Sequence, residues 1–135
     1  MRQPLADSSD DRIELMRGLD LFNRAHFFDA HEVLEDVWRP TRRGTKKRRH
    51  LQGLVQLAVA LHHESRGNLV GARSVLDRAL RNLAGAEQSL PQLDLDRLRS
   101  ECSHWQRHLA GKSPRPSLPC ITLRTAQTKH PPAKI

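Results

Sequence analysis

The chain has 135 residues, of which 37% are hydrophobic and 4% aromatic, a composition that is typical of one compact globular domain. Its 23 Lys and Arg exceed its 15 Asp and Glu, so the formal net charge is +8. The longest apolar run, residues 57–61, is far shorter than the roughly 20 residues of a membrane span, so we expect no transmembrane helix and no membrane association. We expect a cytoplasmic protein whose two cysteines, Cys102 and Cys120, are free thiols.

Positive charge is concentrated in two segments. Residues 39–50 hold seven Lys or Arg and residues 111–135 hold five more, and neither segment contains Asp or Glu. Outside them, 11 basic residues stand against 15 acidic ones, so the rest of the chain is mildly acidic. The net charge therefore does not by itself indicate a fold that binds nucleic acid.

Hydrophobic periodicity predicts five helices, over about residues 10–24, 28–38, 46–65, 69–83 and 95–109. Thr45, Asn68 and Asp94 are candidate N-caps because their side-chain oxygens can accept hydrogen bonds from free amides of the first turn. Gly67 is a candidate for the left-handed residue after the third helix, and Pro40 cannot continue the second.

We therefore expect an all-α protein, a compact bundle of about five helices that forms one domain over residues 10–110. The third helix is largely apolar from residue 51 to 61, so we expect it and its antiparallel neighbour, the second helix, at the centre of the bundle. Residues 1–9 are predicted to be a flexible lead-in. Residues 111–135 contain five prolines and no apolar stripe, and are predicted to be a flexible basic tail, disordered or loosely docked.

The most informative segment is residues 27–38, FFDAHEVLEDVW. His31 and Glu35 are four residues apart and lie with Leu34 and Trp38 on the helix face that is predicted to point inward. Burying an unpaired polar group costs on the order of 1–3 kcal/mol, so both side chains need partners.

Polar partners are available just before the second predicted helix and along one side of the third: Asn23, Gln52, Gln56 and His63. His62 lies about a third of a turn away from that side. The residues alone leave open which of the two histidines meets His31.

Three kinds of chemistry suit this set of side chains. The first is a hydrogen-bonded polar network that fixes the register of the helices. The second is a Zn²⁺ or Fe²⁺ site formed by His31, Glu35 and His63, although the HExxH zinc motif is not met because position 35 holds Glu. The third is a general acid–base pair of His31 and Glu35.

A basic cluster lies at the predicted turn between the second and third helices: Arg42, Arg43, Lys46, Lys47, Arg48 and Arg49. Clustered cations at a helix start can hold a phosphate or sulfate, and they can contact nucleic acid irrespective of its sequence. The chain has no recognition-helix pattern and no interleaved aromatic residues. The cluster could equally be solvated, or pair with the acidic patch Asp29, Glu32 and Asp36 within the chain or across a homodimer.

Residues 22–39, FNRAHFFDAHEVLEDVWR, resemble the first motif of the domain-of-unknown-function family 309. Residues 51–63, LQGLVQLAVALHH, followed by Gly67-Asn68 and Gly71-Ala72, resemble the rest of its signature, and the similarity spans roughly residues 12–85. The resemblance implies an all-α domain of bacterial, archaeal and plastid-lineage proteins with no established activity. It marks these positions as important: Asn23, His31, Glu32, Glu35, Trp38, Gln52, Gln56, the His62/His63 pair, Gly67 and Asn68.

From these observations we predict a binding or scaffold module with an inward network of His, Glu and Gln side chains. The first alternative is a small metal- or ligand-dependent enzyme centred on His31 and Glu35. The second is a nucleic-acid accessory protein that uses the basic cluster.

Overall fold

The computed structural model describes residues 9–125. It contains five α-helices, α1 (Ser9–Asn23), α2 (Phe27–Trp38), α3 (Lys46–Ser65), α4 (Leu69–Asn82) and α5 (Leu95–Leu109), and a short 3₁₀ helix η1 (Ala86–Gln88). The predicted all-α fold is thus confirmed, and in this part of the chain extended backbone pairs only at an isolated bridge between Leu93 and Leu123. The predicted lead-in lies outside the described residues, apart from Ser9, which begins α1.

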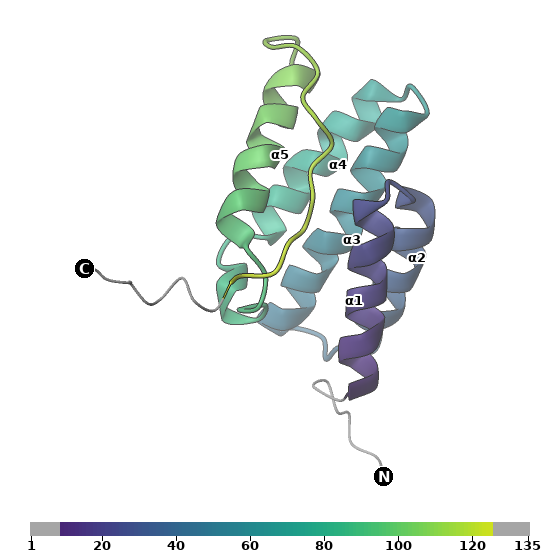
Figure 1. The fold of residues 1–135 in the computed structure, drawn as a ribbon, viewed down its shortest axis with the longest axis vertical. Coiled ribbons are helices and arrows are strands. Elements are labelled where there is room, and N and C mark those ends of the chain that lie inside the picture. Colours follow the sequence, from purple (N-terminus) through teal and green to yellow (C-terminus); the bar gives the residue numbers. More distant parts are fainter. Residues whose placement is uncertain (1–8, 126–135) are drawn as a thin grey trace, which may run out of the picture.

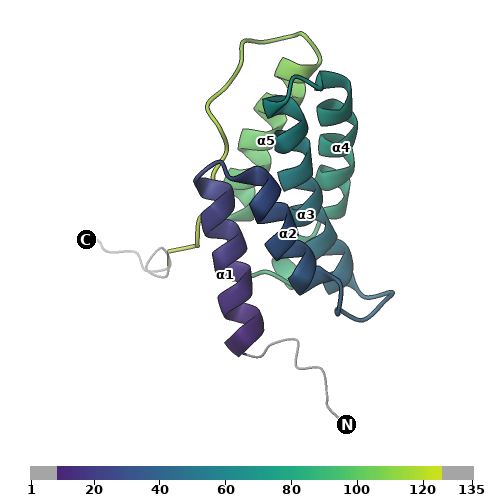
Figure 2. The same cartoon turned by 90° about the vertical axis from the view of Figure 1, so that its right-hand side faces the viewer.

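Each helix packs mainly against its neighbours in the chain, and α3 lies between α2 and α4, antiparallel to both (Figures 1 and 2). The core gathers around α3, whose Leu54, Leu57 and Ala58 are fully enclosed. Gly53 permits the close approach of α4, because a Cβ atom there would lie 2.8 Å from Leu83 Cγ. The predicted central, antiparallel pairing of the second and third helices is confirmed.

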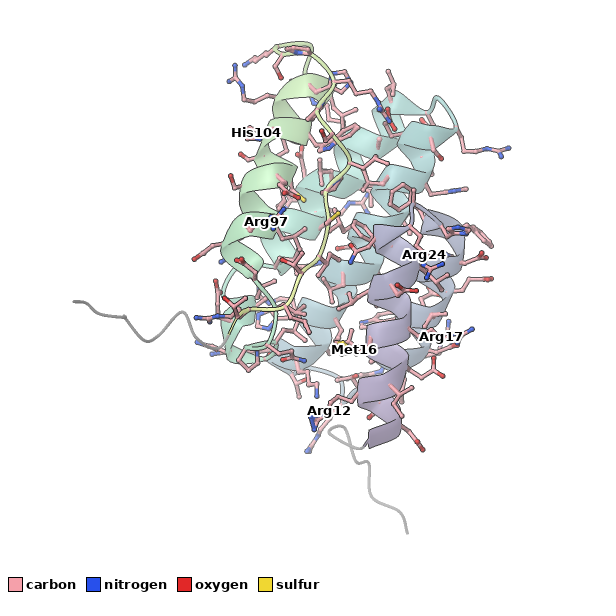
Figure 3. The ribbon with its side chains drawn as sticks, viewed as in Figure 1. Arg12, Met16, Arg17, Arg24, Arg97 and His104 are labelled. Atoms are coloured by element: carbon pink, nitrogen blue, oxygen red, sulfur yellow. The ribbon has the colours of Figure 1, made fainter. Side chains whose placement is uncertain are left out.

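The outer surface of the bundle is lined with charged residues. Arg17 of α1 and Arg24, which directly follows α1, are exposed, whereas Met16 packs against the core (labelled in Figure 3). Both arginines form exposed ion pairs one turn back, with Glu14 and Asp20 at 3.1 Å. None of the helices within residues 9–125 is long and apolar enough to cross a membrane.

The predicted helix ends are confirmed. Thr45 Oγ1 accepts a hydrogen bond from the Arg48 amide at 3.2 Å, and Asn68 Oδ1 accepts one from the Gly71 amide at 3.0 Å. Asp94 Oδ1 caps α5 in the same way at 3.1 Å. Gly67 has a φ of 79°, the left-handed conformation that is unstrained only for glycine.

Arg48, in the first turn of α3, reaches back to the C-terminal end of α2. Its Nη1 donates to the backbone carbonyls of Thr41, Arg39 and Trp38 at 2.8, 3.0 and 3.4 Å. Its guanidinium also lies 4.4 Å from the centre of the Trp38 ring. A cation here satisfies carbonyls that a helix leaves free at its end, and it interacts favourably with the negative end of the helix dipole.

Two further arginines act in the same way at the end of α4. Arg49 donates to the carbonyls of Arg81 and Ala84 at 3.4 and 3.3 Å. Arg99, from α5, donates to the Leu83 carbonyl at 3.0 Å and pairs with Glu87. The end of α4 and η1 are therefore fastened to α3 and α5 by charge-assisted hydrogen bonds.

His50 is the one buried polar residue in the core of the described chain, with 1% of its surface exposed. Its Nδ1 lies 2.7 Å from Ser89 Oγ. Burial lowers the pKa of His50 below its ordinary value of 6.5, and the charges of Arg49 and Lys46 lower it further. The Ala84 backbone opposes these effects without outweighing them.

Of the tail predicted to be disordered or loosely docked, residues 111–125 lie against the bundle. Residues 111–125, here called the strap, run back along the bundle between α5 and α1 (Figures 1 and 2). Asn23 bonds both main-chain groups of Ile121, and Trp105 Nε1 donates to the Ser117 carbonyl at 2.9 Å. The strap lacks helical periodicity because its backbone is extended and bonded to side chains. Residues 126–135 lie outside the described residues.

We predict that Arg48→Met lowers the free energy of unfolding by about 1–3 kcal/mol, because it leaves the carbonyls at the end of α2 without their charged donor. Arg43→Met is the matched control, since Arg43 is exposed and forms no side-chain hydrogen bond within residues 9–125. Urea denaturation measures both. Equal losses of unfolding free energy in the two variants would show that the effect comes from removing one positive charge and not from the hydrogen bonds of Arg48.

We also predict that the protein loses stability as the pH falls below about 6.5, the pKa of an unfolded histidine. The unfolded chain binds the proton of His50 more readily than the folded chain, so His50 favours folding above this pH and ceases to do so below it. His50→Gln should flatten the pH profile of the melting temperature. His104→Gln, at an exposed position on α5 (Figure 3), should leave its shape unchanged, and a profile that His50→Gln does not alter would contradict this role.

Candidate functional site

Four rings from α2 and α3 form a cluster at the end of the bundle where α2 begins and α3 ends. We call Phe28, His31, His62 and His63 the ring cluster. The Phe28 ring lies 5.2 Å from the His31 ring and 5.4 Å from the His62 ring, and the two α3 rings are 6.4 Å apart. Phe28 is 49% exposed, so a large apolar ring lies at the surface between two imidazoles.

The orientation of His31 is set by its own helix. Its Nδ1 lies 2.9 Å from the Phe28 carbonyl, which can only accept a hydrogen bond, so Nδ1 carries a proton. In the neutral ring Nε2 then holds the lone pair, 3.8 Å from Glu35 Oε1. Glu35 also accepts from Arg39 at 3.1 Å. His31 thus offers a free Nε2 at the edge of α2, beside a carboxylate that is already paired.

The predicted inward network is not assembled in the described chain. Asn23 bonds the strap, and Gln56 accepts a hydrogen bond from Asn82 of α4 at 2.7 Å. His63 lies 3.3 Å from Asn68 at the turn between α3 and α4. Gln52 is half-buried and forms no side-chain hydrogen bond within residues 9–125. His62, rather than His63, is linked to His31, through Phe28.

The remaining motif residues lie apart from one another. Trp38 is half-buried and holds the Arg48 guanidinium, while its Nε1 is buried without a hydrogen-bond partner. Glu32 is exposed on the outer side of α2. The motif therefore supplies several separate structural contacts in addition to the ring cluster.

The metal site considered from the sequence does not form in the structure. Among residues 9–125 no group of three or more His, Cys, Asp or Glu side chains is arranged to hold a metal ion. His31 and Glu35 are adjacent, but the ring of His63 turns toward Asn68. Burial raises the pKa of the Cys102 thiol to about 12, so this cysteine is not a nucleophile at neutral pH.

The basic cluster is divided among several roles. Arg48 and Arg49 donate to carbonyls at helix ends, as described above, and Lys46 Nζ lies 3.4 Å from Gln88 Oε1. Arg42 and Arg43 are exposed on the turn. Lys46, Arg48 and Arg49 are thus directed toward the protein rather than toward an external anion.

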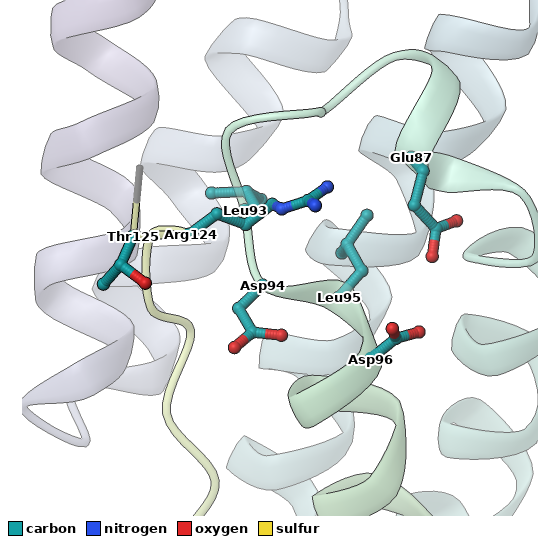
Figure 4. A pocket seen from close by; sticks show the side chains of 7 residues that line it. All are labelled: Glu87, Leu93, Asp94, Leu95, Asp96, Arg124 and Thr125. Atoms are coloured by element: carbon teal, nitrogen blue, oxygen red, sulfur yellow. The ribbon is translucent and has the colours of Figure 1, made fainter. Parts of the chain in front are cut away.

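Two cavities lie at the other end of the molecule, away from the ring cluster. The larger, of about 710 Å³, has an apolar floor that includes Leu15, Val37 and Leu51, and its rim includes Asp11 and Lys47. The smaller, of about 220 Å³, lies where the strap meets the start of α5, and its lining is shown in Figure 4. Neither gathers the motif residues.

The sequence motif does not single out Phe28, although the sequence does indicate that its ring lies at the surface. Two phenylalanines in succession on a helix are about 100° apart, so both cannot face the same core. Phe27 is the buried one, edge-on to Phe22 at 5.2 Å, and this directs Phe28 outward. The hydrogen bonds of Glu101 and Trp105 with the strap could not be predicted in this way, because their partners are main-chain groups.

Comparison with known proteins places these features in a family context. The model of the domain of unknown function DUF309 matches residues 15–75, which include α2, α3 and the ring cluster. The chain is 36% identical over 72 residues to the uncharacterised protein YpuF of Bacillus subtilis (strain 168), a region that covers 52% of this chain and 40% of YpuF. It is 30% identical over 79 residues to an uncharacterised protein of Aquifex aeolicus (strain VF5), covering 58% of this chain and 23% of that protein. Residues 15–75 of the chain thus match the DUF309 domain, and the chain spans less than half the length of these two relatives.

Proposed function

We propose that the chain is a binding module that recognises a partner protein through the ring cluster. The observation that carries this proposal is the half-exposed Phe28 ring, held between His31 and His62 at 5.2 and 5.4 Å. Partly exposed aromatic rings supply much of the binding energy in protein interfaces, because they bury a large apolar area at little cost in conformational entropy.

The polar groups around Phe28 define the partner's chemistry. His31 Nε2 holds a lone pair in the neutral ring, so it accepts a hydrogen bond from a partner's amide or hydroxyl. The proposed partner therefore places an apolar side chain on Phe28 and a hydrogen-bond donor on His31.

A binding role has better support than the enzymatic alternative. His31 and Glu35 have no third ligand for a metal within residues 9–125, and Glu35 is already paired with Arg39. A nucleic-acid role draws on the basic cluster, whose Arg48 and Arg49 are engaged at helix ends. The ring cluster, by contrast, has exposed surface that no described part of the chain covers.

A stability comparison tests whether Phe28 is a surface residue retained for binding. Phe28→Ala should change the free energy of unfolding by about 1 kcal/mol or less, because the ring is half in water already. Phe27→Ala should lower it by about 3–5 kcal/mol, since this neighbouring ring is buried against Phe22. Urea denaturation of both variants provides the measurement, and a similar loss in each would place Phe28 in the core instead.

A photo-crosslinking amino acid at position 28 tests the interaction itself. Expressed in its native cells, the full chain should form one prominent protein adduct on illumination, and the adduct should be lost with His31→Ala. The matched control carries the same crosslinker at Ile13, an exposed apolar residue of α1. Identical adducts from positions 28 and 13, or none from position 28, would contradict a binding role for the ring cluster.

A further inference from the structure

The strap lies between α1 and α5 (Figures 1 and 2), and we call the surface that it covers, which includes Asn23, Glu101 and Trp105, the groove. On the α1 side, the Asn23 side chain contacts the main chain of the strap. Asn23 Oδ1 accepts from the Ile121 amide at 2.7 Å, and Asn23 Nδ2 donates to the Ile121 carbonyl at 2.9 Å. A neighbouring β-strand would make the same two hydrogen bonds to this residue. Asn23 thus recognises an extended backbone irrespective of the side chain it carries.

The opposite wall of the groove, on α5, also contacts the main chain. Trp105 Nε1 donates to the Ser117 carbonyl at 2.9 Å, and Glu101 Oε1 accepts from the Cys120 amide at 3.0 Å. Side chains from two helices therefore hold three successive points of one extended segment. Recognition of this kind depends on backbone conformation, as it does when a peptide is added to a sheet edge.

The end of the strap near residue 124 is held through backbone hydrogen bonds. The Asp94 amide donates to the Thr122 carbonyl at 2.8 Å, and the Arg124 amide donates to the Gln92 carbonyl at 2.9 Å. Figure 4 shows Arg124 and Thr125 beside Leu93 and Asp94 at this point. These two hydrogen bonds extend the part of the strap whose main chain is bound as far as residue 124.

Side-chain selectivity in the groove comes from three positions. Ile121 is 3% exposed and is the anchor, and Pro119 is buried two residues before it, whereas Leu118 and Leu123 are 39% and 54% exposed. Six residues before the anchor, Arg115 pairs with Glu64 at 3.0 Å and lies 5.1 Å from the centre of the Trp105 ring. The occupant is therefore an extended segment with a cation six residues, and a proline two residues, before a buried aliphatic side chain.

We propose that the groove between α1 and α5 is a peptide-binding site, which the strap fills as an intramolecular occupant and which an extended segment of a partner protein takes when the strap is displaced. The partner's segment has the chemistry of the strap: an extended backbone, an Arg or Lys, and a branched aliphatic residue six positions later that is preceded by a proline two positions earlier. The site shares no residue with the ring cluster, so it is a second binding surface and stands independently of the function proposed above.

Tethering explains why the groove is filled by the chain's own residues. The strap follows α5 directly through the turn at Gly111, so its effective concentration at the groove is on the order of millimolar. A free peptide with the same contacts competes poorly with it. Weakening the anchor of the strap, without altering the groove, should make the site accessible to a peptide in solution.

The test uses the full-length Ile121→Asp variant, in which the anchor is charged and Asn23, Glu101 and Trp105 are unchanged. A fluorescent peptide of residues 114–125, with Cys120→Ser to prevent oxidation, is titrated with this variant and followed by fluorescence anisotropy. We expect saturable 1:1 binding, and binding at least tenfold weaker to the wild-type protein. A peptide that itself carries Ile121→Asp should bind the variant at least tenfold more weakly than the unmodified peptide.

Asn23→Ala, added to the Ile121→Asp variant, should weaken peptide binding by about tenfold, since it removes two hydrogen bonds to the main chain. Far-UV circular dichroism verifies that each variant is folded. A folded Ile121→Asp variant that does not bind the peptide would overturn the proposal, as would binding that is unaffected by Asn23→Ala.

Hydrogen exchange of the wild-type protein is a second test, which does not require the Ile121→Asp variant to fold. The amides of Cys120 and Ile121 should exchange through a local opening, at least tenfold faster than the core amides of α3 around Leu57. If these amides instead exchange only with global unfolding, the strap is a fixed part of the core and the proposal is wrong.

Discussion

The arrangement of α2 and α3 depends on the contacts of Arg48 with the Trp38 ring and with the carbonyls at the end of α2. Arg48 joins the last turn of α2 to the first turn of α3, so the two helices run antiparallel from a common point. The first turn of α2 is then brought beside the last turn of α3, and Phe28 meets His62. The ring cluster is thus a consequence of a contact at the opposite end of the same two helices.

The distribution of charge has a related explanation. A net charge of +8 invites the idea of an acidic partner, yet several arginines are used within the protein. Arg48, Arg49 and Arg99 satisfy carbonyls at the ends of α2 and α4, and Arg115 pairs with Glu64. A guanidinium suits this task because its five donors can reach several carbonyls while its face packs on an aromatic ring. Net charge is therefore a poor guide to the partners of this protein.

Local features of the fold were predictable from the sequence, and distant ones were not. Thr45, Asn68 and Asp94 act on amides three residues away, so their capping roles depend only on neighbouring residues. Helical spacing correctly grouped His31 with Glu35 on one face of α2. Spacing does not reveal which neighbour that face meets, and α3 has a helix on each side, so Gln56 bonds Asn82 of α4 instead of facing α2.

The docking of the strap was not predictable from the sequence, for a different reason. Its hydrogen bonds join main-chain groups to side chains of Asn23, Glu101 and Trp105, and such contacts leave no periodic pattern. Its prolines are compatible with an extended backbone as well as with disorder. Composition alone therefore could not separate a docked extended segment from a loose tail.

The central claim is that most motif residues hold the fold together, whereas Phe28 and its exposed neighbours on α2 are retained for binding. An alanine scan of unfolding free energies tests it most directly. The account predicts two separate groups: Asn23, Trp38, Arg48 and Gln56, each with a loss above about 1 kcal/mol, and Phe28, Glu32 and Glu35, each with a smaller one. Overlapping losses in the two groups would contradict it, because the ring cluster would then be one more structural contact.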